Sequence, residues 1–141
     1  MKRDLQFEIV YPHPPNEVWR ALTDPGSLAA WLMDNDFAPS QGHKFHFRSK
    51  SRFGPRRIPC EVLAVDEPRL LSFSWGGQGS VVTFRLEPAA EGTRLRLEHT
   101  GLSGVRGLAL GWVLRHGWVH KIGQRLPEVL SRMTEHTRFK P

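Results

Sequence analysis

Five strand-like segments follow one another between residues 43 and 101; one of them, 58–65, is largely apolar, and the others alternate apolar and polar residues. A period of two predicts β-strands that have one buried and one exposed face. The turns carry Asp-Glu-Pro at 66–68, Gly-Gly-Gln-Gly at 76–79 and Ala-Ala-Glu-Gly at 89–92, which favours consecutive antiparallel hairpins. We therefore expect an antiparallel sheet whose apolar face must be covered by another element.

The remaining elements lie on both sides of these strands. A first strand is predicted at 5–11, followed by short helices at 16–22 and 27–32 with a Thr-Asp-Pro-Gly break between them. Apolar residues recur at helical spacing over 108–133 and predict a long C-terminal helix that covers the sheet. Within its stripe, Gly123 predicts either a gap or a close approach to the sheet. Pro127 removes the hydrogen bond to the Gly123 carbonyl and predicts a kink.

Length and composition limit the class of protein. The 141 residues fit a single domain, 1–141, which is long enough to bury a core without disulfides. The lone cysteine, Cys60, excludes an intramolecular disulfide and favours a reducing compartment. No signal peptide and no apolar run of membrane-spanning length is present, so we expect a soluble, cytoplasmic protein.

The net charge of +6 is concentrated in one stretch. Residues 37–60 carry six basic side chains and no acidic one. The simplest interpretation is a solvated hairpin; the functional alternative is that Arg48, Lys50 and Arg52 attract an anionic head group. Stacking aromatics are sparse there and no nucleic-acid motif accompanies the charge, so a nucleic-acid partner is not expected.

The strand at 93–101 places a histidine on its apolar face, because His99 has the parity of Leu95 and Leu97. Four roles are open to it: a core imidazole with satisfied nitrogens, a ligand contact, a catalytic group or a metal ligand. His116 and His120 have metal-ligand spacing, but no Glu follows the first of them and no carboxylate shares the stripe. We therefore expect no metal, and the glycine-rich segments match no phosphate-binding pattern, so no cofactor is expected either.

Four local patterns resemble a known family. They are "PHPPNEVWRALTDPGSLAAWL", "GHKFHF", "CEVLAVDEPRLLSFSW" and "GTRLRLEHTGL". In this order they are similar to the activator of heat-shock-protein-90 ATPase homologue (AHSA-type) family of the START-like, or SRPBCC, superfamily. The resemblance implies an α+β helix-grip fold, as in birch-pollen-allergen-like proteins: a curved antiparallel six-stranded sheet wrapped around a long C-terminal helix, in the order β-α-α-β5-α.

The resemblance also implies a cavity between sheet and helix, and we expect it to bind a small hydrophobic or amphipathic molecule or a lipid without catalysis. Catalytic residues are therefore not assigned. The expected lining is Trp31, Phe45, Phe47, Phe73, Trp75, Phe84, Leu97, His99, Trp112, His116, Val119 and Gly123. Two alternatives remain: a cyclase- or aromatase-like enzyme using the cavity histidines, and a chaperone-related module that binds a protein partner. The sequence is also compatible with a core that these aromatic residues fill completely, without a cavity. It does not distinguish a monomer from a homodimer.

Overall fold

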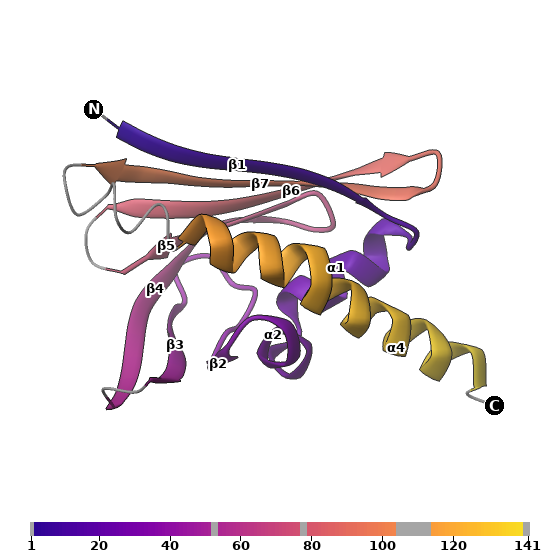
Figure 1. The fold of residues 1–141 in the computed structure, drawn as a ribbon, viewed down its shortest axis with the longest axis horizontal. Coiled ribbons are helices and arrows are strands. Elements are labelled where there is room, and N and C mark those ends of the chain that lie inside the picture. The colour runs from indigo at the N-terminus through magenta and orange to yellow at the C-terminus, as the bar shows by residue number, and fades with distance from the viewer. Residues whose placement is uncertain (1, 52–53, 77–78, 104–113, 140–141) are drawn as a thin grey trace.

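The computed structural model describes residues 2–51, 54–76, 79–103 and 114–139 (Figure 1). Its strands are β1 (Lys2–Tyr11), β2 (Asp34–Asn35), β3 (Lys44–Ser51), β4 (Gly54–Asp66), β5 (Leu70–Trp75), β6 (Ser80–Ala89) and β7 (Gly92–Ser103). Its helical elements are α1 (Pro15–Thr23), α2 (Pro25–Trp31), residues 114–120, the π-helical turn η1 (Lys121–Arg125) and α4 (Leu126–Phe139). The order of elements agrees with the expectation from the sequence.

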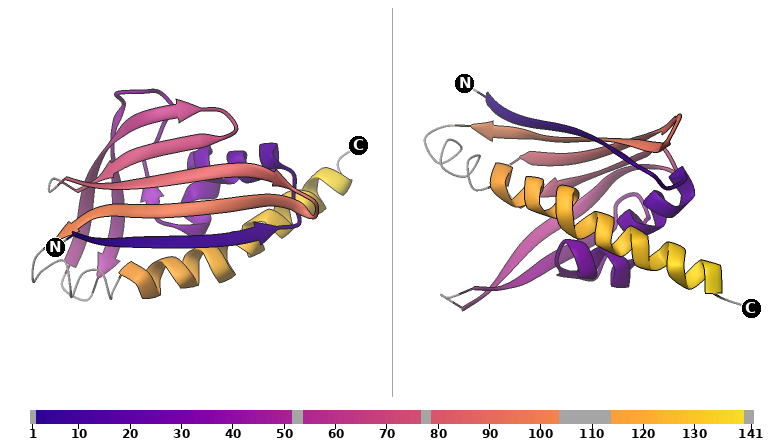
Figure 2. Two further views of the ribbon diagram at one scale, coloured as in Figure 1. Left: turned by 90° about the horizontal axis from the view of Figure 1, so that it is seen from above. Right: turned by 45° about the vertical axis from the view of Figure 1, so that its right-hand side comes forward.

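The strands form one antiparallel sheet in the order β1-β7-β6-β5-β4-β3-β2. The sheet is curved, and the C-terminal helix lies across its concave face (Figure 2). The described residues form seven strands, where six were predicted. The additional strand, β2, has two residues that pair with Phe47 and Arg48 of β3, and a segment this short carries no periodicity that a sequence could reveal.

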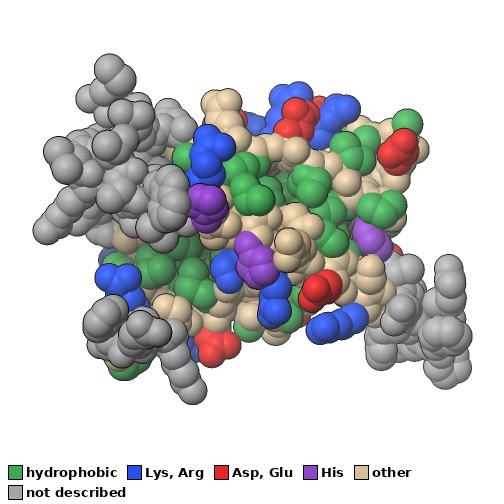
Figure 3. Space-filling model, in the orientation of Figure 1, with side chains coloured by type: hydrophobic (Ala, Val, Ile, Leu, Met, Phe, Trp, Pro, Cys, Tyr) green, Lys and Arg blue, Asp and Glu red, His purple; other side chains and the backbone are tan. Residues whose placement is uncertain are grey.

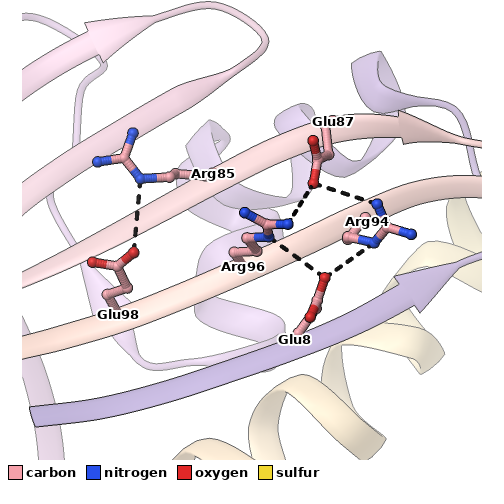
Figure 4. Close-up of polar contacts among 6 residues, drawn as sticks. All are labelled: Glu8, Arg85, Glu87, Arg94, Arg96 and Glu98. Carbon is pink, nitrogen blue, oxygen red and sulfur yellow. Dashed lines mark hydrogen bonds and ion pairs between the residues drawn. The ribbon is translucent and has the colours of Figure 1, made fainter.

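The outer face of the sheet carries the charged residues of β1, β6 and β7 (Figure 4). Glu8 Oε1 lies 3.1 Å from Arg94 Nε, and Glu87 Oε1 lies 3.3 Å from Arg96 Nη2. Such partly exposed ion pairs contribute only about 0–1 kcal/mol each. Their main effect is to keep this face hydrated, so that the opposite, apolar face is the one that packs.

The two short helices begin at prolines and are separated by a cap. Pro15 occupies the first turn of α1, where its missing N–H is tolerated. Asp24 lies between the two helices and is the N-cap of α2. Its carboxylate accepts a hydrogen bond from Ser27 N at 2.9 Å. Arg125 Nη2 and Lys121 Nζ donate to the carbonyls of Ala30 and Leu32, both at 2.9 Å, at the other end of α2. They supply donors where the helix itself has none.

The sequence predicted a kink at Pro127 and loss of the bond to the Gly123 carbonyl; the structure has the π-turn η1 immediately before this proline, which shifts the affected carbonyl to Ile122. Leu126 N–H bonds to the carbonyl of Lys121, five residues back. Pro127 has no N–H to offer, so the Ile122 carbonyl lacks an intrahelical donor. The Tyr11 hydroxyl on β1 donates to that carbonyl at 2.6 Å, within the core.

In the part of the chain that is described, no helix has the length and apolarity to cross a membrane.

Substituting Tyr11→Phe should lower the free energy of unfolding by about 1–3 kcal/mol, because the Ile122 carbonyl would be left buried and unsatisfied. Chemical denaturation measures this directly. In a Pro127→Ala background the restored N–H lets the helix satisfy its own carbonyls, so the same substitution should cost less. An equal cost in both backgrounds would contradict this account of the π-turn.

Candidate functional site

His99 lies at the centre of the candidate site. It is on β7, its exposed fraction is 0%, and its cross-strand partners are Leu5 on β1 and Val82 on β6. Trp118 Nε1 donates a hydrogen bond to His99 Nδ1 at 3.1 Å. The other nitrogen, Nε2, is buried and has no hydrogen-bond partner among the residues that the structure describes. The prediction that His99 occupies the apolar face is therefore correct, and only half of its hydrogen-bonding capacity is used.

An aromatic cluster surrounds this imidazole. The Trp75 ring lies 5.6 Å from the His99 ring and 5.8 Å from the Trp118 ring, centroid to centroid. Further ring contacts, with centroids between 5.3 and 6.2 Å apart, extend the cluster through Phe47, Phe45, Phe73, Phe84 and Trp31. Leu97 is buried on the same face of β7. The structure thus brings together eight of the predicted lining residues: Trp31, Phe45, Phe47, Phe73, Trp75, Phe84, Leu97 and His99.

The helix presents a different side from the one predicted. Val119 is 52% exposed, and His116 and Gly123 are also exposed, so these three do not join the buried cluster. A β-carbon at Gly123 would meet no atom within 4 Å, which means that this glycine marks neither a gap in the core nor a close approach to the sheet. The buried residue is Trp118 instead. Trp112 lies outside the described residues.

The burial of Trp118 has a signal in the sequence, although the predicted stripe does not include this residue. A ladder at four-residue spacing runs through Leu114, Trp118, Ile122, Leu126 and Leu130, all of them buried or packed against the core. In an ideal α-helix each step of four residues drifts by about 40°. The wider π-turn between Lys121 and Arg125 offsets this drift, which keeps the ladder on one side.

The head-group candidates are placed by strand parity. Phe45 and Phe47 of β3 are buried on the inner face of the sheet. Arg48 follows Phe47 directly, so its side chain lies on the outer face, and its cross-strand neighbour on β4 is Arg57. Lys50 is two residues beyond Arg48 on the same strand, and its side chain is not described. Arg52 lies outside the described residues. Whether Arg48, Lys50 and Arg52 attract an anionic head group therefore stays a prediction.

Two hollows lined by described residues share no residue with the aromatic cluster. One of about 400 Å³ lies between α1, α2 and α4 and is lined by Arg20, Ala30, Val129 and Met133 among others. Another, of about 840 Å³, is lined by Ala29, Asp34, Asn35, Arg48, Ser49 and Pro55. The rings of the cluster contact one another, and the cavity that they are expected to line stays a prediction.

Burial determines the titration of the site. Desolvation lowers the pKa of His99 to about 4, so the imidazole is neutral at pH 7. Desolvation likewise raises the pKa of Cys60 to about 12, which leaves its thiol protonated and a poor nucleophile. Across the described residues, no group of three or more His, Cys, Asp or Glu side chains is arranged to hold a metal ion.

Comparison with known proteins places this arrangement in a family. Residues 12–131 match the model of the Activator of Hsp90 ATPase homolog 1-like protein family. The chain belongs to this family. The match covers α1, α2, β2 to β7 and the helix as far as residue 131, and therefore includes every residue of the aromatic cluster. No curated protein matches the sequence.

Solved structures share the whole fold. A crystal structure of a protein from Mesorhizobium loti is 35% identical, covers 99% of this chain and 100% of its own, and has a TM-score of 0.73. A solution structure from Bacillus halodurans is 31% identical over 91% of this chain and 96% of that one, with a TM-score of 0.77. A protein from the dynemicin biosynthetic locus is 26% identical over 91% of this chain and 47% of its own, with a TM-score of 0.75. The similarity to these three structures supports the helix-grip architecture of the chain.

His99 should make the stability of the protein depend on acid. Its pKa is about 4 when folded and about 6.5 in a free histidine, so the unfolded chain binds more protons between these values. The free energy of unfolding should therefore be at its full value above about pH 6.5 and fall by an order of 3 kcal/mol as the pH drops towards 4.

Urea denaturation at several pH values compares the wild type with His99→Gln, which does not titrate but retains an acceptor for Trp118. The variant should lose this component of the pH dependence. His120→Gln, a change at an exposed histidine, is the matched control for the loss of one imidazole. Identical pH profiles for wild type and His99→Gln would contradict the burial of a neutral imidazole.

Proposed function

We propose that this protein binds a small hydrophobic or amphipathic molecule between the curved sheet and the C-terminal helix, and that it does not itself catalyse a reaction. One observation carries the proposal: the rings of Trp75 and Trp118 pack against His99, whose buried Nε2 has no hydrogen-bond partner among the residues that the structure describes. Ligand sites typically combine large apolar walls with a few polar groups that orient the ligand.

The surface next to the cluster supports this proposal. Hydrophobic side chains lie on the face between β1 and the C-terminal helix (Figure 3). Phe7 and Ile9 of β1 and Leu114 of the helix are only partly buried against the core. An apolar molecule entering between strand and helix would bury this surface, at about 25 cal/mol for each Å² removed from water. The relative from a biosynthetic locus is also consistent with a small-molecule role for this fold.

The chemistry of the cluster favours binding over catalysis. A general base must titrate near the working pH and have a free lone pair. His99 has a pKa of about 4, and its Nδ1 lone pair is already engaged by Trp118. His116, the other histidine expected in the cavity, is exposed on the helix. The cyclase-like alternative therefore lacks the pair of cavity histidines on which it was based.

Native mass spectrometry of the purified protein tests the proposal. We expect an excess mass on the order of a few hundred daltons, as for a drug-sized ligand, which solvent extraction releases and identifies. Trp118→Ala should lose it, whereas Arg85→Ala on the outer face should retain it as the matched control. A ligand-free mass, together with no thermal shift across lipids and aromatic compounds, would contradict ligand binding and favour a surface that contacts a protein partner.

A further inference from the structure

The hydrogen bond from Trp118 determines which nitrogen of His99 carries the proton. An indole N–H can only donate, so the His99 Nδ1 that lies 3.1 Å from it must be an unprotonated acceptor. In a neutral imidazole the proton is then on Nε2. His99 therefore presents a hydrogen-bond donor, and not a lone pair, at its second nitrogen.

This donor is the exception among the buried polar groups. The Tyr11 hydroxyl donates to Ile122 O, and Trp31 Nε1 donates to Ala21 O at 2.8 Å. Within the described part of the protein, His99 Nε2 is the only buried side-chain nitrogen or oxygen without a hydrogen bond. Burying a donor without an acceptor destabilises a protein, and native structures contain few such groups. An acceptor atom from a ligand would remove this penalty.

The surroundings of Nε2 limit the charge of that acceptor. The row of cross-strand partners through His99 consists of Leu5, Val82, Phe73 and Val62, all of them buried. The two rings against the imidazole are those of Trp75 and Trp118. No member of this row or ring pair carries a charge, so a carboxylate placed here would lose its hydration without gaining a counter-ion. A carbonyl or ether oxygen has no such penalty.

We propose that the site takes an uncharged, ring-containing molecule whose carbonyl or ether oxygen accepts a hydrogen bond from His99 Nε2. The inference rests on the proposed function and names the class of ligand. Trp75 is half-buried, whereas His99 and Trp118 are buried. The ring of the ligand packs against the two indoles while its oxygen meets Nε2–H.

Three compounds of nearly the same shape test this assignment by calorimetry: fluorene, 9-fluorenone and fluorene-9-carboxylate. The ketone should bind about tenfold more tightly than the hydrocarbon, because it alone satisfies the buried donor without introducing a charge. The carboxylate should bind no better than fluorene. In His99→Phe, which keeps a ring but removes the donor, the preference for the ketone should disappear.

A measurement without ligand keeps the inference testable if His99→Phe does not fold. Long-range ¹H–¹⁵N correlation of the wild type should show His99 with its proton on Nε2. In Trp118→Phe, which lacks the indole donor, the proton should be distributed over Nδ1 and Nε2. A proton on Nδ1 would overturn the inference. Equal binding of fluorene and 9-fluorenone would also overturn it while leaving ligand binding intact, whereas failure of all three compounds to bind would count against the proposed function itself.

Discussion

The arrangement of the core depends on one interruption in the hydrogen bonds of the C-terminal helix. The bond from Leu126 N–H to Lys121 O and the missing N–H of Pro127 together leave the Ile122 carbonyl to Tyr11. This joins the helix to the first strand across more than a hundred residues of sequence. The same turn sends Lys121 to the end of α2. A feature that weakens the helix locally thereby connects it to two other elements.

The π-turn also determines the site, because it decides which residue of the preceding turn faces the sheet. Trp118 is directed into the core, where its indole engages His99 and contacts Trp75. Val119, its neighbour, is left at the surface. The tautomer of an imidazole on a strand is in this way determined by the hydrogen bonding of a helix. The fold and the chemistry of the candidate site cannot be separated.

Most of the sheet could be predicted from the sequence, because side chains on a strand must alternate. Parity alone placed Phe45, Phe73 and His99 on the buried face, and the structure agrees. The same rule, applied to β3, would have assigned Arg48 to the outer face from the start. The helix was less predictable, since Val119 fits an ideal 3.6-residue period and Trp118 fits only a helix that contains a wider turn. The polar contact between Trp118 and His99 joins two elements and has no sequence signature.

One feature of the core has a practical use. Cys60 is the sole cysteine of the chain, and it is buried on β4 with its pKa raised to about 12. Thiol reagents attack the thiolate, which hardly exists in the folded protein at neutral pH. Alkylation must then wait for the sheet to open around β4. The rate at which this thiol is modified consequently reports how often the closed structure opens. A bound molecule that stabilises the closed structure will lower this rate of modification.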